Sequence, residues 1–331
     1  MWKLKLFREF ITCFKKLNLS HQLLAVSCLL FASLYPGQNS LQTIVLTPGP
    51  VKSYNLGSPS FFVYPVSDGT PAPALSARGI VVQDAGSKAI LLAKNADTLL
   101  LPASTTKIMT ALVSLDYWSD LDTVIEVKNE DRAIGQTIDL QRGERLTIGS
   151  LLKGLLVHSG NDAALALADN YCAPSVAVGE VGSCGYATFV SAMNAKARSL
   201  HLDHTVYKNP SGVEQYGHLT TPRDLATLAS VAMASPIIAE IVGTKYTLIT
   251  DVSRETLHPL ESTNELLGVI PGLTGLKTGW TTGAGECLVS YIERDGHAVV
   301  VVVLGSLDRF LDTTKLVDWV YLHHNWITPV L

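Results

Sequence analysis

The chain has 331 residues, of which 47% are hydrophobic and 16% are charged, and its formal net charge is -4. Residues 1–16 hold five basic groups and one acid, a net +4, so the remaining 315 residues carry -8. A net-acidic body without a basic cluster argues against nucleic acid as a partner, because phosphate binding needs clustered Lys and Arg. The five cysteines include no C-x-x-C pair, which argues against a disulfide scaffold and a zinc site.

The first 35 residues join that basic tail to an apolar segment. Residues 23–35 are thirteen apolar or small residues without charge, which suits an export signal better than a spanning helix of roughly 20 residues. Counting from Leu17 gives nineteen uncharged residues, so an uncleaved membrane anchor is the alternative. Positive charge before the segment orients the rest of the chain outside the cytoplasm.

Proline and hydrophobic periodicity divide the rest of the chain. Residues 36–75 contain seven prolines, which predicts a linker without its own core, and a folded domain follows over 76–329. Hairpins are expected near both ends of this domain, at 79–94 and 286–304. Strands around a helical middle predict an α+β fold with one antiparallel sheet. The expected helices, with Ser150 and Thr221 as N-caps, cover 102–118, 150–157, 163–171, 186–200, 221–234 and 310–326.

A serine and a lysine lie one helical turn apart at Ser104 and Lys107. At this spacing both side chains lie on one face of a helix, and the serine becomes a nucleophile if a neutral lysine takes its proton. The same S-x-x-K pattern recurs at Ser150 and Lys153, where the serine is interpreted as a helix cap. The pattern alone is therefore weak evidence for catalysis.

Two further motifs follow in the chain. Ser159-Gly160-Asn161 after an apolar helix predicts a tight turn that exposes a hydroxyl and an amide. Lys277, Thr278 and Gly279 precede a predicted strand, where a lysine and a threonine can bind a carboxylate and a glycine permits close approach of a substrate backbone.

The ordered set of S-x-x-K, S-x-N and K-T-G is typical of β-lactamases and penicillin-binding proteins. The flanking residues around all three motifs, with Asn209–Gly212 and residues 222–226, resemble the D-alanyl-D-alanine carboxypeptidases, the low-molecular-weight penicillin-binding proteins. The resemblance covers about residues 76–327. It implies the β-lactamase/penicillin-binding-protein fold, an antiparallel sheet with helices on both faces and a helical subdomain.

The resemblance also implies roles for these residues. Ser104 would attack the carbonyl between the two terminal D-alanines of a peptidoglycan stem peptide, and Lys107 would accept its proton. Ser159 would relay a proton to the leaving D-alanine, and Asn161 would hold Lys107 and the substrate amide. Lys277 and Thr278 would bind the terminal carboxylate of the substrate. The backbone N–H groups of Ser104 and Trp280 would form the oxyanion hole. A β-lactam would acylate the same serine.

Other expectations are less specific. Arg223 would lie near the carboxylate pocket, or else be a helix N-terminal arginine that pairs with Asp224 or faces solvent. Cys172 and Cys184 would form a disulfide, which suits an oxidising exterior, with free thiols as the alternative. The resemblance implies no metal or organic cofactor, and the nine histidines show no metal-ligand pattern. Many relatives carry a C-terminal anchor. In this chain, attachment to the membrane of the cell envelope is expected to fall to the N-terminus. If the signal is cleaved, the enzyme would instead be secreted.

Three alternative functions are considered for this set of residues. A DD-endopeptidase that cleaves peptidoglycan cross-links would use the same groups. A serine β-lactamase would need a deacylating glutamate, and residues 190–215 show no Glu-x-x-Leu-Asn segment; Glu214 is followed by Gln-Tyr-Gly. A non-catalytic wall-binding relative would be expected to lack Ser104 or one of the lysines, yet all are present.

Overall fold

The computed structural model describes residues 63–129, 133–173 and 183–328, together with Asn18, Ser20 and Leu23. The chain divides into two compact units, Met1–Pro59 and Ser60–Leu331. All the strands and helices described below belong to the second unit. The basic tail and the apolar segment that were predicted as a signal or anchor lie almost entirely outside the described residues.

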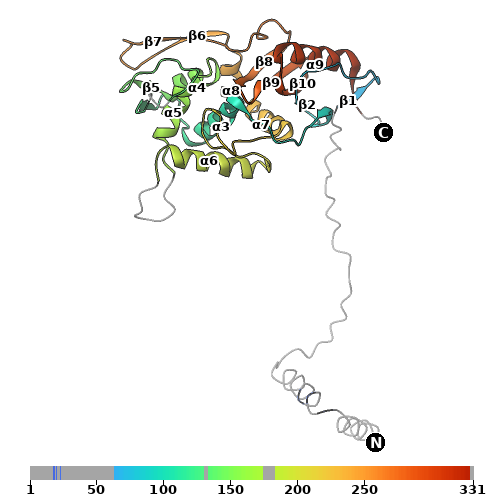
Figure 1. Cartoon of the computed structure of the whole chain (residues 1–331), viewed down its shortest axis with the longest axis horizontal. Helices are drawn as coiled ribbons and strands as arrows, with labels where there is room; N and C mark the ends of the chain where they lie inside the picture. The colour runs from blue at the N-terminus through green and yellow to red at the C-terminus, as the bar shows by residue number, and fades with distance from the viewer. Residues whose placement is uncertain are drawn as a thin grey trace, which may run out of the picture. The chain divides into compact units, whose positions relative to one another are not determined.

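A five-stranded antiparallel sheet forms the centre of the second unit (Figure 1). Its order is β3 (Ile90–Lys94), β2 (Gly79–Asp84), β10 (His297–Ser306), β9 (Gly285–Arg294) and β8 (Leu273–Thr281). The two hairpins predicted near the ends of the domain are confirmed, and β2 pairs with β10. Strands from near the two ends of the folded domain therefore meet in one sheet, and β8 lies at the edge of this sheet.

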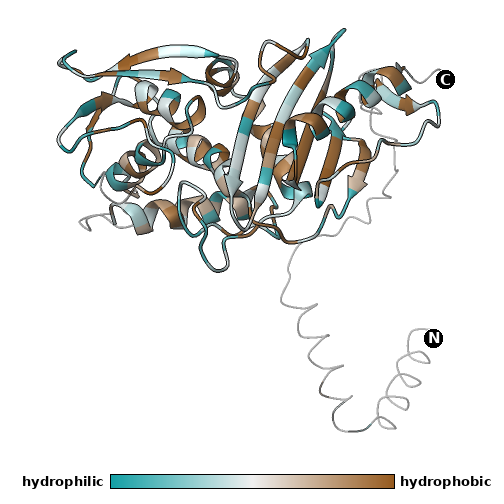
Figure 2. Ribbon diagram, turned by 45° about the horizontal axis from the view of Figure 1, so that its top comes forward, coloured by the Kyte–Doolittle hydropathy of each residue, from teal (hydrophilic) through white to brown (hydrophobic). Residues whose placement is uncertain are grey.

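Alternation along β10 sends apolar side chains to both faces of the sheet, as a doubly covered strand requires. Val299, Val301 and Val303 join one buried cluster, and Val300 and Val302 join the other. Helix α9 (Arg309–His323) covers the first face and α7 (Pro222–Met233) covers the second. Figure 2 shows hydrophobic residues, in brown, along parts of the central strands.

The helical part follows the predicted ranges closely. A short 3-10 helix η1 (Ala103–Thr106) leads into α3 (Lys107–Tyr117), and the others are α4 (Ile148–Leu156), α5 (Asn161–Asn170), α6 (Tyr186–Ser199) and α8 (Pro236–Val242). Thr221 caps α7, as predicted. The predicted cap Ser150 is wrong. Thr147 caps α4, because its hydroxyl accepts from the backbone N–H of Ser150.

Two predicted boundaries also differ from the structure. The predicted linker extends too far, because β1 (Tyr64–Ser67) pairs with β11 (His324–Ile327). The final helix ends at His323, earlier than predicted, because the residues after it form β11. Two further hairpins flank the helices, β4 (Val124–Glu126) with β5 (Arg145–Thr147) and β6 (Tyr246–Thr250) with β7 (Leu257–Glu261).

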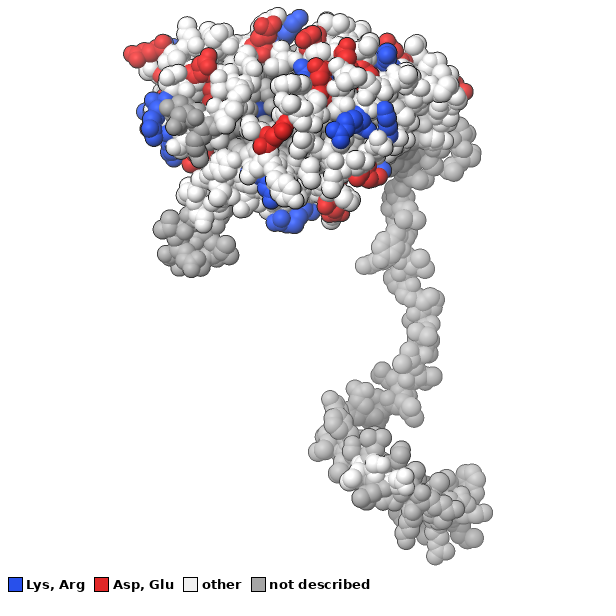
Figure 3. All heavy atoms as spheres, viewed as in Figure 1, with Lys and Arg blue, Asp and Glu red and all other residues white. Residues whose placement is uncertain are grey.

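Charged side chains on the face shown in Figure 3 are of both signs and are interspersed. The acids that give the chain its negative balance are not gathered into one patch on that face. A charged molecule that approaches this face would therefore meet individual charges of either sign, and not an electrostatic field of one sign over the whole face.

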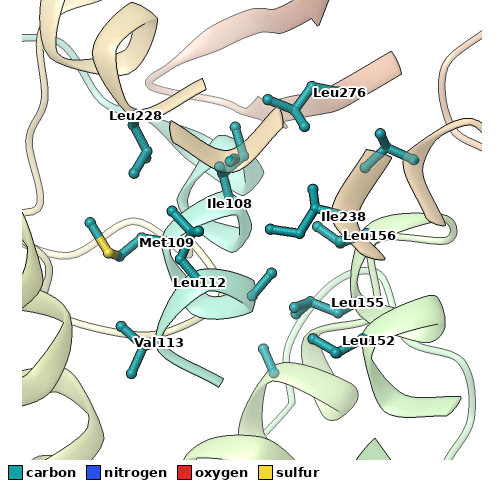
Figure 4. Packing of buried hydrophobic residues seen from close by; sticks show 14 of the residues in the cluster. Ile108, Met109, Leu112, Val113, Leu152, Leu155, Leu156, Leu228, Ile238 and Leu276 are labelled. Carbon is teal, nitrogen blue, oxygen red and sulfur yellow. The ribbon is translucent and has the colours of Figure 1, made fainter. Parts of the chain in front are cut away.

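The larger core cluster packs α3 between the other helices and the sheet. Figure 4 shows α3 side chains such as Ile108 and Leu112 among Leu152, Leu155 and Ile238, with Leu276 of β8 nearby. The first turn of α3 begins at Lys107, so packing of this helix fixes the position of that lysine.

The cysteines follow the sequence analysis. Cys172 and Cys184 are joined by a disulfide, the pairing that was hypothesised. Cys287 is a buried free thiol on β9, and burial raises its pKa to about 11. An uncharged buried thiol of this kind acts as a small apolar side chain.

Candidate active site

Ser104 stands in η1, directly before α3, on a backbone that is held from two sides. Ala103 has a φ of 49°, an uncommon conformation for a residue with a side chain. Gly212 lies so close that a Cβ on it would be 1.8 Å from the carbonyl oxygen of Ala103. A Cβ on Gly279 of β8 would be 2.9 Å from the backbone nitrogen of Ser104. Both glycines are therefore required for this close packing.

Lys107 is fully buried below Ser104 and has three hydrogen-bond contacts. Its Nζ lies 2.8 Å from Ser104 Oγ, 2.7 Å from Asn161 Oδ1 and 2.8 Å from the carbonyl oxygen of Ser211. Burial, and then the nearby charge of Lys277, hold the pKa of Lys107 well below its usual value, while Asp162 acts in the opposite direction. The predicted pairing of Ser104 with Lys107 is confirmed.

The second motif forms the turn between α4 and α5. Ser159 adopts a φ of 66° there, and its side chain lines the same cleft as Ser104. Asn161 donates from Nδ2 to the carbonyl oxygen of Ile134 while its Oδ1 contacts Lys107. Asp162 accepts backbone N–H groups at Ile138 and Leu140, both near 3 Å. This motif therefore positions the lysine and one wall of the cleft together.

The third motif precedes β9, the strand that the sequence predicted after it, and it lies within a further strand, β8, that was not predicted. Lys277 is buried, its Nζ donates to the carbonyl oxygen of Thr278 at 3.1 Å, and burial together with the charge of Arg309 lowers its pKa to about 7. The hydroxyls of Thr278 and Thr263 are hydrogen-bonded. The Trp280 side chain is 62% exposed at the cleft.

These motifs surround one cleft of about 580 Å³. The lining comes from the three motif segments, the loop between β4 and β5, the loop after α6, the residues after β7 and the start of α9: Ser104, Ile134, Gly135, Gln136, Ser159, Asn161, Ser211, Gly212, Val213, Glu214, Thr263, Thr278, Gly279, Trp280, Thr281, Thr282 and Arg309. Lys107 and Lys277 lie below this surface. Segments from residue 104 to residue 309 thus converge on one site.

Several of these residues were not anticipated. Arg309 donates from Nη1 to the carbonyl oxygen of Gly279 at 3.0 Å and brings a cation to the part of the cleft beside β8. Ser211 contributes only a backbone carbonyl, which no side-chain pattern encodes. Thr263 is the middle residue of Ser262-Thr263-Asn264, which repeats the S-x-N pattern of the second motif. This repeat is the signal in the sequence that could have pointed to Thr263.

Arg223 is not brought to the cleft. It begins α7, and its Nε and Nη2 donate to both carboxylate oxygens of Asp97 at 2.6 and 2.9 Å. The expectation that Arg223 lies near the carboxylate pocket is therefore wrong, whereas Arg309 does line the cleft. Across the described ranges, no group of three His, Cys, Asp or Glu side chains is placed to hold a metal ion.

Comparison with known proteins agrees with this geometry. The family model for Peptidase_S11, the D-alanyl-D-alanine carboxypeptidases, matches residues 67–307. The chain belongs to this family. It is thus a serine-type D-Ala-D-Ala carboxypeptidase, a hydrolase. The D-alanyl-D-alanine carboxypeptidase DacF of Bacillus subtilis strain 168 is 31% identical over 80% of this chain and 67% of its own length. That of Streptomyces sp. strain K15 is 35% identical over 75% of this chain and 88% of its own.

Solved structures confirm the predicted fold. The Streptomyces K15 DD-transpeptidase has a TM-score of 0.69 at 31% identity and is covered completely by 76% of this chain. Penicillin-binding protein D2 from Listeria monocytogenes, in its ampicillin-bound form, has a TM-score of 0.64 at 30% identity over 76% of this chain and 100% of its own. The predicted β-lactamase/penicillin-binding-protein architecture is therefore correct.

The family is one of bacterial cell-wall peptidases, which indicates an extracytoplasmic location. Among the residues that the structure describes, no single helix is long and apolar enough to cross a membrane. Helices α7 and α8 reach the length and apolar composition of a membrane span only when they are taken together, and the chain bends by 104° between them.

Proposed function

We propose that the protein removes the terminal D-alanine from peptidoglycan stem peptides through an acyl-enzyme on Ser104. The observation that carries this proposal is the set of contacts around Lys107 Nζ. A neutral amine has two N–H bonds and one lone pair. The carbonyl oxygens of Asn161 and Ser211 can only accept hydrogen bonds, so they engage both N–H bonds and leave the lone pair for the hydroxyl proton of Ser104.

The lowered pKa of Lys107 supplies the neutral form that this step needs. Ser104 Oγ bonds to the carbonyl carbon of the penultimate D-alanine while its proton passes to Nζ. The backbone N–H groups of Ser104 and Trp280 would stabilise the resulting oxyanion. Loss of one such donor typically reduces the rate by about 100- to 1,000-fold.

The carboxylate of the last D-alanine would be held by Lys277, Thr278 and Arg309. Because β8 is an edge strand, an extended peptide could add to the sheet beside it. When the peptide bond breaks, the leaving amine takes a proton through Ser159. Water then hydrolyses the acyl-serine and regenerates Ser104.

The same chemistry would cleave a cross-link, and one relative, the D-alanyl-D-alanine endopeptidase of Escherichia coli K12, is 28% identical over 75% of this chain. No observation at the site favours that activity over removal of a terminal residue. The presence of Arg309 beside Thr278 favours a free terminal carboxylate, because a guanidinium binds a carboxylate in a bidentate manner.

We further propose that residues 1–35 export the domain and tether it to the cytoplasmic membrane, since a basic tail precedes the apolar segment. Fractionation of cells after an alkaline wash tests the tether. N-terminal sequencing of the exported protein would reveal a cleaved signal, and a soluble mature form would contradict the anchor.

Two assays on the domain test the enzymatic proposal. Fluorescent penicillin should label the wild type, and Ser104→Ala should not be labelled. Ser150→Ala, which alters the other S-x-x-K pattern outside the cleft, is the matched control and should be labelled normally. A pentapeptide ending in D-Ala-D-Ala should release free D-alanine, and labelling retained by Ser104→Ala would refute the nucleophile.

A further inference from the structure

Glu214 lies beside the turn that packs on the nucleophile. Two residues earlier, Gly212 adopts a φ of 88° and approaches the carbonyl oxygen of Ala103. One residue before Gly212, the carbonyl oxygen of Ser211 accepts a hydrogen bond from Lys107. The backbone from which Glu214 extends is thus fixed relative to η1.

The carboxylate of Glu214 reaches across the end of the cleft to the turn that joins β8 and β9. Its Oε1 accepts from the backbone N–H of Gly283 at 2.6 Å. Hydrogen bonds from the Thr281 hydroxyl, and then from the backbone at Gly283, hold its pKa below the usual value, and Ala284 adds a smaller contribution. Thr281 Oγ1 in turn accepts from the backbone N–H of Ala284 at 3.1 Å. The Glu214 carboxylate therefore accepts directly from the β8–β9 turn at Gly283, and Thr281 of the same turn helps to hold its pKa low.

This turn controls the last residues of β8. On one side β8 is held by its pairing with β9, in which Trp280 lies opposite Glu286. Its other side is the open edge of the sheet, where Gly279 closely approaches the nitrogen of Ser104. The contact of Glu214 with Gly283 ties the end of β8 to the η1 side of the cleft only three residues beyond Trp280.

We propose that Glu214 is a positioning residue that sets the separation between the backbone N–H groups of Ser104 and Trp280. It acts as a hydrogen-bond acceptor through the β8–β9 turn, not by touching the reacting atoms. The inference rests on the proposed function, because it assigns to these two groups the stabilisation of the oxyanion. A donor displaced from its position loses most of its effect on the transition state.

Three substitutions separate an acceptor from a charge. Glu214→Gln keeps an oxygen at the same reach but removes the charge. Glu214→Asp keeps the charge but is one methylene shorter and cannot reach Gly283. Glu214→Ala removes both. If the carboxylate served only as a charge facing the substrate, Asp would function and Gln would fail; the positioning role predicts the reverse order.

Two measurements on the purified full-length protein test this role. One is the second-order rate constant for acylation by a fluorescent penicillin, and the other is the affinity for a peptide boronic acid, whose serine adduct is a tetrahedral anion. We expect Glu214→Ala and Glu214→Asp to lower both by about 10- to 100-fold, and Glu214→Gln to retain values within about threefold of wild type. The KM for the pentapeptide should change little, while kcat falls in parallel with boronate affinity.

Glu240→Ala, an exposed glutamate on α8 away from the cleft, is the control and should match the wild type. Thermal unfolding of every variant identifies any loss of fold, and if Glu214→Ala does not fold, the order of the Asp and Gln variants decides. Wild-type boronate affinity in Glu214→Ala or Glu214→Asp would overturn the inference. An unlabelled wild type would instead refute the proposed function, so the two failures are distinguishable.

Discussion

The two faces of the central sheet bury polar groups in opposite ways. On the face covered by α9, Asp312 is buried. Burial alone would raise its pKa, but hydrogen bonds from Ser76, Ser306 and the backbone lower it. Ser76 Oγ and Ser306 Oγ both donate to it at 2.7 Å. This buried charge is fully partnered and joins the start of the domain to its last helix.

On the face that carries α3, two lysines are buried close enough that each cation is disfavoured by another. Lys107 is destabilised as a cation by burial and by Lys277, and Lys277 by burial and by Arg309. Buried charges without opposite partners cost folding free energy. The comparison teaches that one face of the sheet buries a carboxylate together with its partners, while the other buries two amines whose charged forms are disfavoured, because its chemistry needs them.

Replacement of Lys107 should give the largest effect on the catalytic face. Lys107→Arg keeps the positive charge, but a guanidinium cannot be deprotonated in a protein. Loss of a general base reduces the rate by about 100- to 10,000-fold. Stopped-flow acylation by penicillin should therefore show a loss of this size for Lys107→Arg, as large as for Lys107→Met.

The neighbouring S-x-x-K pattern provides the control, since Lys153→Arg should acylate at the wild-type rate. A Lys107→Arg variant with near-normal acylation would show that charge, and not proton transfer, is the function of this side chain.

The sequence was sufficient for the architecture and for the side chains that react. Periodicity located the two hairpins and most helices, because burial on one face leaves a repeating pattern. It failed at β1 and β11, where short edge strands pair only with each other across nearly the whole chain. No local signal separates such a strand from a proline-rich linker or from the end of a helix.

At the site, motif order found the side chains of Ser104, Lys107 and Lys277, because their chemistry restricts residue type. The carbonyl oxygen of Ser211 was missed, because any residue offers one. Arg309 was missed because its contact with β8 depends on where α9 begins after the hairpin. Arg223 was misplaced for the related reason that Asp97, distant in the sequence, pairs with it.

On the α9 face, a single cavity should affect stability alone. Leu316 is completely buried there, and Leu316→Ala should lower the free energy of unfolding by about 2–5 kcal/mol. Chemical denaturation measures this loss, and the acylation rate constant of the folded protein should stay unchanged. Leu322→Ala on the same helix, where the leucine is 75% exposed, should do neither. A fall in the acylation rate for Leu316→Ala would mean that the two faces are coupled.

The smallest expected effects distinguish the faces by pH. Lys277 has a pKa of about 7, so the free enzyme loses this cation as the pH rises through 7. The kcat/KM for a substrate with a terminal carboxylate, which reports on the free enzyme, should therefore decline above pH 7. In Lys277→Met the overall value should be lower and this decline should disappear. A decline that persists in Lys277→Met would assign it to another group.

The stability of Lys277→Met should change in the opposite direction from its activity. Between pH 7 and 10.5 the unfolded lysine binds a proton that the native lysine does not, so stability should rise with pH across this window. At or below pH 7 the buried cation lowers the stability of the native state in full. Lys277→Met should therefore raise the melting temperature by a few degrees at pH 6 to 7, and by progressively less toward pH 10, because the lysine is then neutral in both states. Thermal unfolding over this pH range measures the difference between the two proteins. An equal gain at every pH would attribute the stabilisation to packing of the methionine, and a loss at pH 6 would show that the cation has a stabilising partner on the catalytic face.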